Sequence, residues 1–140
     1  MNRKYERYIN YIVSDIKPPF FKDANSGYGY GLSEKEFEMV LSKVYNQPVT
    51  IDDNSVYNNR GNKIYFENSV GDWIKRGYDD QGNRIYYEDS DGYWRKWEYD
   101  DQGNEIYYED SDDFWRKSEY DGQGNLIYFE DSDGDIRDNR

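Results

Sequence analysis

The sequence predicts an α+β protein in which two short N-terminal helices precede an antiparallel β-sheet built from about four tandem β-hairpins. Three observations predict it. Apolar residues near the N-terminus recur at helical spacing, residues from Gly61 onward repeat with a period of 21, and each repeat holds two turn signals between Tyr-, Ile- and Trp-rich runs. We therefore divide the chain into a helical region, residues 1–55, and a repeat array, residues 56–140.

Two helices are expected in residues 1–55. The first ends at Pro18 and Pro19, and its buried face is formed by Tyr5, Tyr8, Ile9, Ile12, Val13 and Ile16. After a Gly-containing loop at residues 25–32, Ser33 and Glu36 form the pattern of a capping box. This box begins a second helix that runs to about Tyr45, with a buried stripe of Phe37, Val40, Leu41 and Val44. We interpret both helices as a cap for the array, and a docking or dimerisation surface is the alternative.

The repeats begin at Gly61, Gly82, Gly103 and Gly124, and each predicts one hairpin. If the loop at residues 89–92 has four residues, Tyr87 lies opposite Trp94 and shares one face with Ile85. This face is predicted to form a core of Ile64, Phe66, Trp73, Ile85, Tyr87, Trp94, Ile106, Tyr108, Trp115, Ile127, Phe129 and Ile136. The opposite, exposed face then carries Tyr65, Glu67, Tyr86, Glu88, Arg95, Tyr107, Glu109 and Arg116.

The composition restricts the chemistry. The chain has no Cys and no His, so it lacks a thiolate nucleophile, an imidazole base and the ligands of an ordinary zinc site. Asp131, Asp133 and Asp135 match the start of an EF-hand loop, but Ile136 stands where that loop needs Gly. We therefore expect no enzyme activity, no cofactor and no metal. Charged residues interrupt the N-terminal apolar positions, so we expect a protein of the bacterial cytoplasm.

Charge points to a class of partner. Acidic residues outnumber basic ones by 30 to 18, and residues 56–140 hold 22 of the acidic and 11 of the basic side chains. This disfavours direct binding to nucleic acid or to anionic membranes and favours a basic protein. We expect a non-catalytic inhibitor or adaptor that mimics DNA and blocks the basic groove of a nucleic-acid-binding protein. Its predicted acidic contacts are Glu67, Glu88, Asp89, Asp91, Asp100, Asp101, Glu109, Asp110 and Asp112. A purely solubilising role is the alternative account of the charge.

Aromatic side chains suggest a second function, that of a structural or glycan-binding repeat module. Its predicted contacts are Tyr86, Tyr93, Trp97 and Tyr99. Trp97 is informative because the same repeat position holds Arg76 and Ser118, so the repeat does not require a Trp there. Pairing of the exposed edge strands with a second copy of the chain stays open as well.

The run Tyr99, Asp100, Gly103, Asn104 and Ile106 recurs from Tyr78 and Tyr120 and resembles the YD repeat of RHS-type proteins. The resemblance covers residues 56–140 and implies β-strand repeats of about this period. Members of that family are large, usually secreted shells that enclose a toxin. This chain is short and carries Asn where the family commonly has Arg after Gly, so we do not expect a shell. A compact acidic protein with such repeats is also similar to small accessory proteins of bacteriophages, which implies a partner in host defence.

Overall fold

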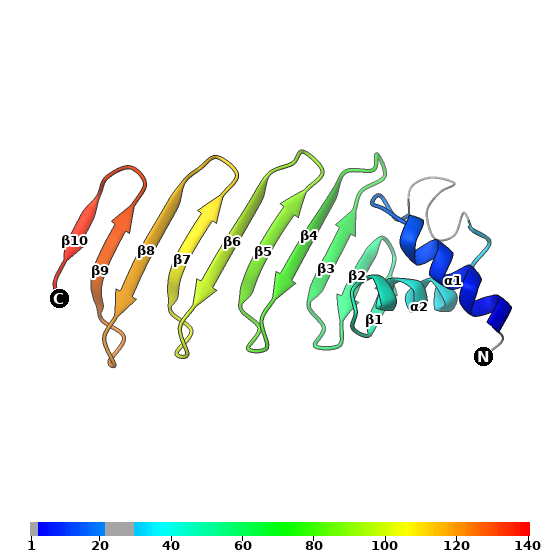
Figure 1. Cartoon of the computed structure of the whole chain (residues 1–140), viewed down its shortest axis with the longest axis horizontal. Coiled ribbons are helices and arrows are strands. Elements are labelled where there is room, and N and C mark those ends of the chain that lie inside the picture. Colours follow the sequence, from blue (N-terminus) through cyan, green and yellow to red (C-terminus); the bar gives the residue numbers. More distant parts are fainter. Residues whose placement is uncertain (1–2, 22–29) are drawn as a thin grey trace. The chain divides into compact units, whose positions relative to one another are not determined.

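The computed structural model describes residues 3–21 and 30–140, and within these ranges it describes the side chains from Arg7 onward. Two helices, α1 (Arg3–Asp15) and α2 (Glu34–Val44), precede ten strands that pair in chain order in one antiparallel sheet (Figure 1). This confirms the predicted fold class. The strands are β1 (Val49–Asp52), β2 (Ser55–Asn58), β3 (Lys63–Glu67), β4 (Trp73–Tyr78), β5 (Arg84–Asp89), β6 (Trp94–Tyr99), β7 (Glu105–Asp110), β8 (Trp115–Tyr120), β9 (Leu126–Asp131) and β10 (Ile136–Asp138).

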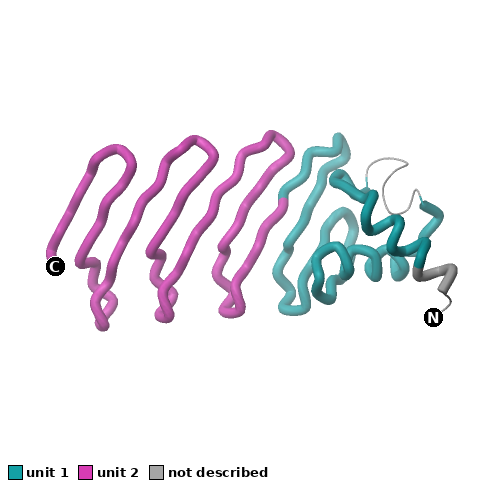
Figure 2. Tube along the Cα trace, in the orientation of Figure 1, with its two compact units in different colours: residues 1–74 teal, residues 75–140 magenta. Residues whose placement is uncertain are grey.

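The chain divides into two compact units, residues 1–74 and residues 75–140 (Figure 2). The first unit holds the helices and the hydrophobic core, and the second consists of strands and turns alone. Residues 22–29 of the predicted loop lie outside the described residues. No helix among the described residues has the length and apolar character needed to cross a membrane.

The helices form where the sequence predicts them. The hydroxyl of Ser33 accepts a hydrogen bond from the backbone N–H of Glu36 at 3.2 Å, and the Glu36 carboxylate accepts one from the backbone N–H of Ser33 at 3.0 Å. This is the predicted capping box. The two helices bury Ile9, Ile12, Phe37, Val40 and Leu41, whereas Tyr8 and Val44 are exposed although the helical pattern placed them on the buried faces.

A hairpin of β1 and β2 precedes the repeats and was not predicted. Its side chains Val49, Ile51 and Val56 are buried in the first unit. α2 holds β1 through two side-chain acceptors: the Ser42 hydroxyl accepts from the N–H of Val49 at 3.1 Å, and the Glu38 carboxylate accepts from the N–H of Ile51 at 2.9 Å. The first unit therefore has a conventional core between its helices and its first strands.

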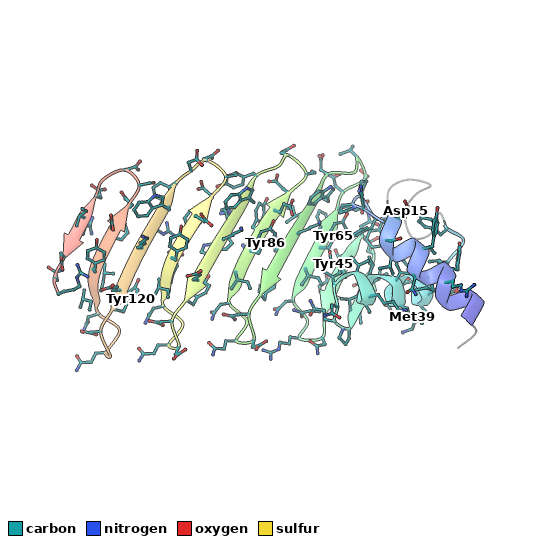
Figure 3. The ribbon with its side chains drawn as sticks, in the orientation of Figure 1. Asp15, Met39, Tyr45, Tyr65, Tyr86 and Tyr120 are labelled. Carbon is teal, nitrogen blue, oxygen red and sulfur yellow. The ribbon has the colours of Figure 1, made fainter. Side chains whose placement is uncertain are left out.

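Tyr65 and Glu67 lie inside this core, each 1% exposed, so the prediction that they lie on an exposed face is wrong (Figure 3 labels Tyr65). The Glu67 carboxylate accepts hydrogen bonds from the backbone N–H groups of Phe20 and Phe21, at 2.7 and 2.9 Å, and from the Tyr65 hydroxyl at 2.8 Å. The rings of Phe20 and Tyr65 pack with centroids 4.5 Å apart. Glu67 is a structural residue that fixes the chain after α1.

In the second unit the strand register differs from the prediction by one residue. Trp94 lies opposite Glu88, and Tyr87 lies opposite Arg95. The loop is shorter than predicted by one residue, because the N–H of Asp89 donates to the carbonyl of Tyr93 at 3.0 Å and this pair closes a loop of residues 90–92. Gly92, at φ +87°, supplies the left-handed residue that follows a tight turn in such loops. A shift of one residue moves a side chain to the other face, so Tyr87 and Trp94 lie on opposite faces and the predicted core stripe is wrong.

The second unit has no core of its own. All of residues 75–140 are described, and among their apolar and aromatic side chains Tyr108 alone is buried, at 8% exposure. Ile85 and Ile136 of the predicted core are exposed. The unit is a single layer of strands, and interactions within that layer must hold it together.

We expect replacement of Glu67 by Ala to destabilise the first unit by about 3 kcal/mol, because two backbone donors and one hydroxyl lose a charged acceptor in the core. The matched control is Glu88→Ala at the equivalent, partly exposed repeat position, with an expected cost below about 1 kcal/mol. Urea unfolding followed by circular dichroism measures both. Equal costs would contradict the structural role of Glu67.

Candidate functional site

The two faces of the second unit carry different side chains, because partners across neighbouring strands share a face. The Tyr–Glu face is formed by Ile85, Tyr86, Glu88, Trp94, Lys96 and Glu98 with their repeat equivalents. The Arg–aromatic face is formed by Arg84, Tyr87, Arg95, Trp97 and Tyr99 with theirs. Ile106 is skipped in the pairing of β6 with β7, and it lines one shallow pocket together with Tyr107. This bulge brings two successive side chains of each repeat to the Tyr–Glu face.

On the Tyr–Glu face, each Tyr hydroxyl donates to the Glu two residues further along the same strand. The distances are 3.0 Å for Tyr86 to Glu88 and 3.4 Å for Tyr107 to Glu109. Partial burial, followed by the hydrogen bond that its hydroxyl donates to Glu88, raises the pKa of Tyr86. The Lys96 ammonium lies 4.9 Å from the Trp94 ring centre. Both predicted acids of this face therefore already accept a local hydrogen bond.

On the Arg–aromatic face, the Arg95 guanidinium lies among three rings. Its central carbon is 4.6 Å from the ring centre of Tyr87, 5.4 Å from that of Trp97 and 5.8 Å from that of Tyr93. Trp97 in turn meets Tyr108 edge-on at 5.7 Å. The predicted contacts Tyr93 and Trp97 are thus brought together around one cation.

Tyr99 lies on the same face, where its hydroxyl donates to the backbone carbonyl of Arg84 at 2.8 Å. Tyr86 lies on the opposite face. The structure therefore gathers three of the four predicted aromatic contacts and separates the fourth from them.

The turns that join β5 to β6, β7 to β8 and β9 to β10 form an edge that we call the acidic turn edge. Its carboxylates are Asp89, Asp91, Asp110, Asp112, Asp113, Asp131, Asp133 and Asp135, and residues 89–93, 110–114 and 131–135 contain no Lys or Arg. Asp89 closes its turn by accepting from the N–H groups of Asp91 and Tyr93, at 3.0 and 3.2 Å. Asp91, Asp112 and Asp133 are exposed.

The opposite turn edge carries the predicted contacts Asp100 and Asp101. Asp100 accepts from the backbone N–H groups of Gln102 and Asn104, at 3.0 and 2.9 Å, and from the Asn104 side-chain amide at 3.1 Å. These hydrogen bonds, led by the backbone N–H of Asn104, hold the pKa of Asp100 below its ordinary value of 3.8. Asp121 has a lowered pKa for the same reason, with Asn125 as donor.

The predicted acidic contacts therefore do not form one surface. Four lie on the acidic turn edge (Asp89, Asp91, Asp110 and Asp112), two on the Tyr–Glu face (Glu88 and Glu109), two on the opposite turn edge (Asp100 and Asp101), and Glu67 in the core. Sequence reasoning missed the contribution of Asp113, Asp131, Asp133 and Asp135 to the acidic turn edge, which alignment of the three turns reveals. Within the described ranges, no three Asp and Glu side chains are placed to hold a metal ion.

The lowered pKa of Asp100 and Asp121 predicts a stability that is present above pH 3.8 and is lost as the pH falls through the lower, folded-state values. We expect the double variant Asp100→Asn with Asp121→Asn to lose less stability than the parent between about pH 4 and about pH 2. Asn58 and Asn68 close equivalent turns, so Asn keeps the turn without titrating. Thermal unfolding across this range is the measurement, and an unchanged acid dependence would contradict the assignment.

Comparison with known proteins finds a weak structural likeness and no matching family. No family model matches the chain, and no curated protein matches it. A solved structure, described as the crystal structure of TcdB2-TccC3-TEV, is similar with 14% sequence identity and a TM-score of 0.37. The similarity covers 65% of this chain and 6% of that chain, so this chain corresponds to a small part of that one. It is a weak structural likeness, and the feature concerned is an antiparallel sheet of hairpins.

Proposed function

We propose that the protein is a non-catalytic adaptor or inhibitor whose acidic turn edge binds a basic surface of a partner protein. The observation that carries the proposal is the acidic turn edge itself, where eight carboxylates lie in three successive turns that contain no basic residue. The partner class that fits is a nucleic-acid-binding protein, including one of host defence, because such proteins present basic grooves.

The spacing of the turns supports mimicry of a phosphate row. Neighbouring strands lie about 4.8 Å apart, so successive turns on one edge lie about 10 Å apart. Two or three carboxylates in each turn then give one negative charge per about 3 to 5 Å. A single strand of duplex DNA carries one charge per about 3.4 Å of helix axis. The acidic turn edge thus matches one DNA strand more closely than it matches a whole duplex.

The turns also hold these charges in place. Asp110 accepts from the backbone N–H groups of Asp112 and Phe114, at 2.9 and 3.3 Å, and Asp131 accepts from those of Asp133 and Asp135, at 3.0 and 3.1 Å. Order present before binding reduces the entropy lost on association. The turn-closing Asp residues are therefore unsuitable for mutation, and the exposed Asp residues that follow them are the positions to test.

We further propose that the repeats are related to the YD repeats of RHS-type proteins. The shared pattern has a direct structural meaning in this chain. Tyr99 ends β6, Asp100 closes the turn, Gly103 takes a φ of +85°, and Asn104 donates its side-chain amide back to Asp100. The relationship concerns the hairpin and its turn, and the proposed binding role does not depend on it.

We expect the triple variant Asp91→Asn, Asp112→Asn and Asp133→Asn to bind the partner about tenfold more weakly than the parent, because it removes three exposed charges from the acidic turn edge. The matched control is Asp80→Asn, Asp101→Asn and Glu98→Gln, which removes the same charge from other exposed positions. The three proteins are used to capture partners from a bacterial lysate, with mass spectrometry as readout, and titration calorimetry then measures affinity for the captured protein.

The proposal requires that the captured protein be retained by the parent and the control, be lost by the edge variant, and be displaced by duplex DNA. Binding should also weaken as salt is raised from about 50 to about 200 mM. Equal retention by both variants would show that the acidic turn edge is not the binding surface.

A further inference from the structure

Three arginines on the Arg–aromatic face form no ion pair with any Asp or Glu side chain that the structure describes. These are Arg76, Arg84 and Arg95. The Nε atom of each is buried and makes no hydrogen bond. Buried donors without acceptors are rare in folded proteins and cost free energy, so this cluster calls for an explanation.

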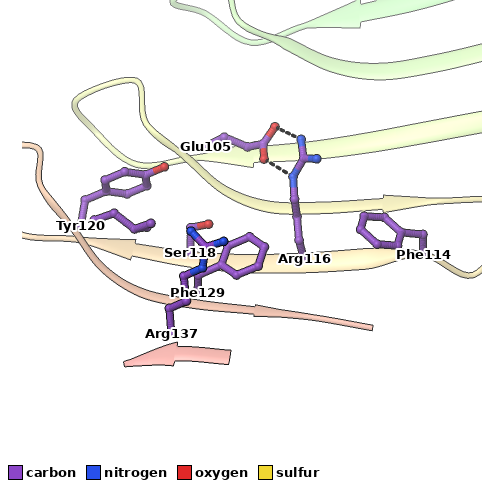
Figure 4. Close-up of a pocket in the computed structure, with 8 residues that line it drawn as sticks. Glu105, Phe114, Arg116, Ser118, Tyr120, Phe129 and Arg137 are labelled. Atoms are coloured by element: carbon purple, nitrogen blue, oxygen red, sulfur yellow. Dashed lines mark hydrogen bonds and ion pairs between the residues drawn. The ribbon is translucent and has the colours of Figure 1, made fainter. Parts of the chain in front are cut away.

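The next repeat shows what such an arginine binds. Arg116 donates from Nε and Nη2 to the two carboxylate oxygens of Glu105, at 2.8 and 3.0 Å (Figure 4). Arg95 and Arg84 occupy the same repeat positions, 21 residues earlier. The earlier repeat therefore has a second guanidinium where the later one has the carboxylate that pairs with its arginine.

The surrounding side chains form walls for a bound group. The rings of Tyr87 and Trp97 flank the Arg95 guanidinium, and Tyr99 is anchored to the Arg84 backbone. Arg76 stands at the repeat position of Trp97, and Tyr87 stands at that of Tyr108, whose ring meets Trp97 at 5.7 Å. Arg76 therefore faces Tyr87 across the strands, on the same face as Arg95.

We propose that Arg76, Arg84 and Arg95 form a binding site for a carboxylate supplied by a ligand, which pairs with Arg95 as the carboxylate of Glu105 pairs with Arg116. An arginine fork matches a carboxylate with two parallel hydrogen bonds, and the aromatic walls exclude water from them. The carboxylate belongs either to an acidic side chain or to an acidic sugar, both of which present this group beside an apolar or ring surface. The site lies on a face of the sheet, separate from the acidic turn edge, and it is tested separately.

The test is a nuclear magnetic resonance titration of the full chain with N-acetylglutamate and with glucuronate, which follows the indole N–H signal of Trp97. We expect a saturable shift with at least one of the two, and the tighter binder identifies the source of the carboxylate. We expect Arg84→Glu to abolish the shift, because the new side chain pairs with Arg95 as Glu105 pairs with Arg116, and to raise the melting temperature.

Two further variants keep the test decisive if Arg84→Glu does not fold. Arg84→Gln should weaken binding by about tenfold or more, since it removes one of the three guanidinium groups of the site. Lys96→Gln removes the same charge from the opposite face and should leave binding unchanged. The proposal is overturned if neither probe gives a saturable shift, if Arg84→Gln binds like the parent, or if inorganic phosphate binds as tightly as both carboxylates.

Discussion

The repeat array depends on one interaction, in which a turn carboxylate accepts hydrogen bonds from two backbone N–H groups of its own loop. All six turn-closing residues of the second unit make it: Asp79, Asp89, Asp100, Asp110, Asp121 and Asp131. In the first unit Asn58 and Asn68 make it with an amide oxygen. A sheet with one buried face takes its register from that face. The second unit has no buried face, so its register must come from its turns.

Contacts within the layer take over part of the role of a core. Arg116 lies over the Tyr108 ring at 4.5 Å, and Lys117 lies over the Trp115 ring at 5.1 Å. Each such contact contributes on the order of 1 kcal/mol, so many are needed. Tyr suits this arrangement because its ring covers the neighbouring strand and its hydroxyl reaches a carboxylate. This explains why 17 Tyr residues occur in a chain of only 35% hydrophobic residues.

The sequence was informative where local chemistry decides the structure. The capping box at Ser33, the helix stop before Pro18 and the hairpin of each repeat follow from nearest neighbours along the chain, and the structure has all three. The faces of the hairpins could not be predicted, because a loop that is one residue shorter than expected before Trp94 exchanges them. The burial of Glu67 depends on Phe20, 47 residues away, which no local pattern reveals.

The candidate sites likewise include residues that the sequence predicts and residues that only the structure reveals. Periodicity located half of the carboxylates of the acidic turn edge, and comparison of repeat positions singled out Trp97. The arginine cluster was missed because the residues that form it are ordinary surface residues in sequence. The structure reveals this cluster through the next repeat, where Glu105 pairs with Arg116. Arg84 stands at the position of Glu105, so Arg95 lacks the corresponding carboxylate.

A layer that is held by its turns can diversify without loss of the fold. The position that holds Arg76, Trp97 and Ser118 in successive hairpins makes no contribution to turn closure, so its side chain is free to change after duplication of a repeat. Each new copy inherits the scaffold through its Asp and Gly residues and acquires its own surface chemistry at such positions. The side chains on the surface of each hairpin can therefore change independently of those on the other hairpins, while the turn residues keep the backbone unchanged.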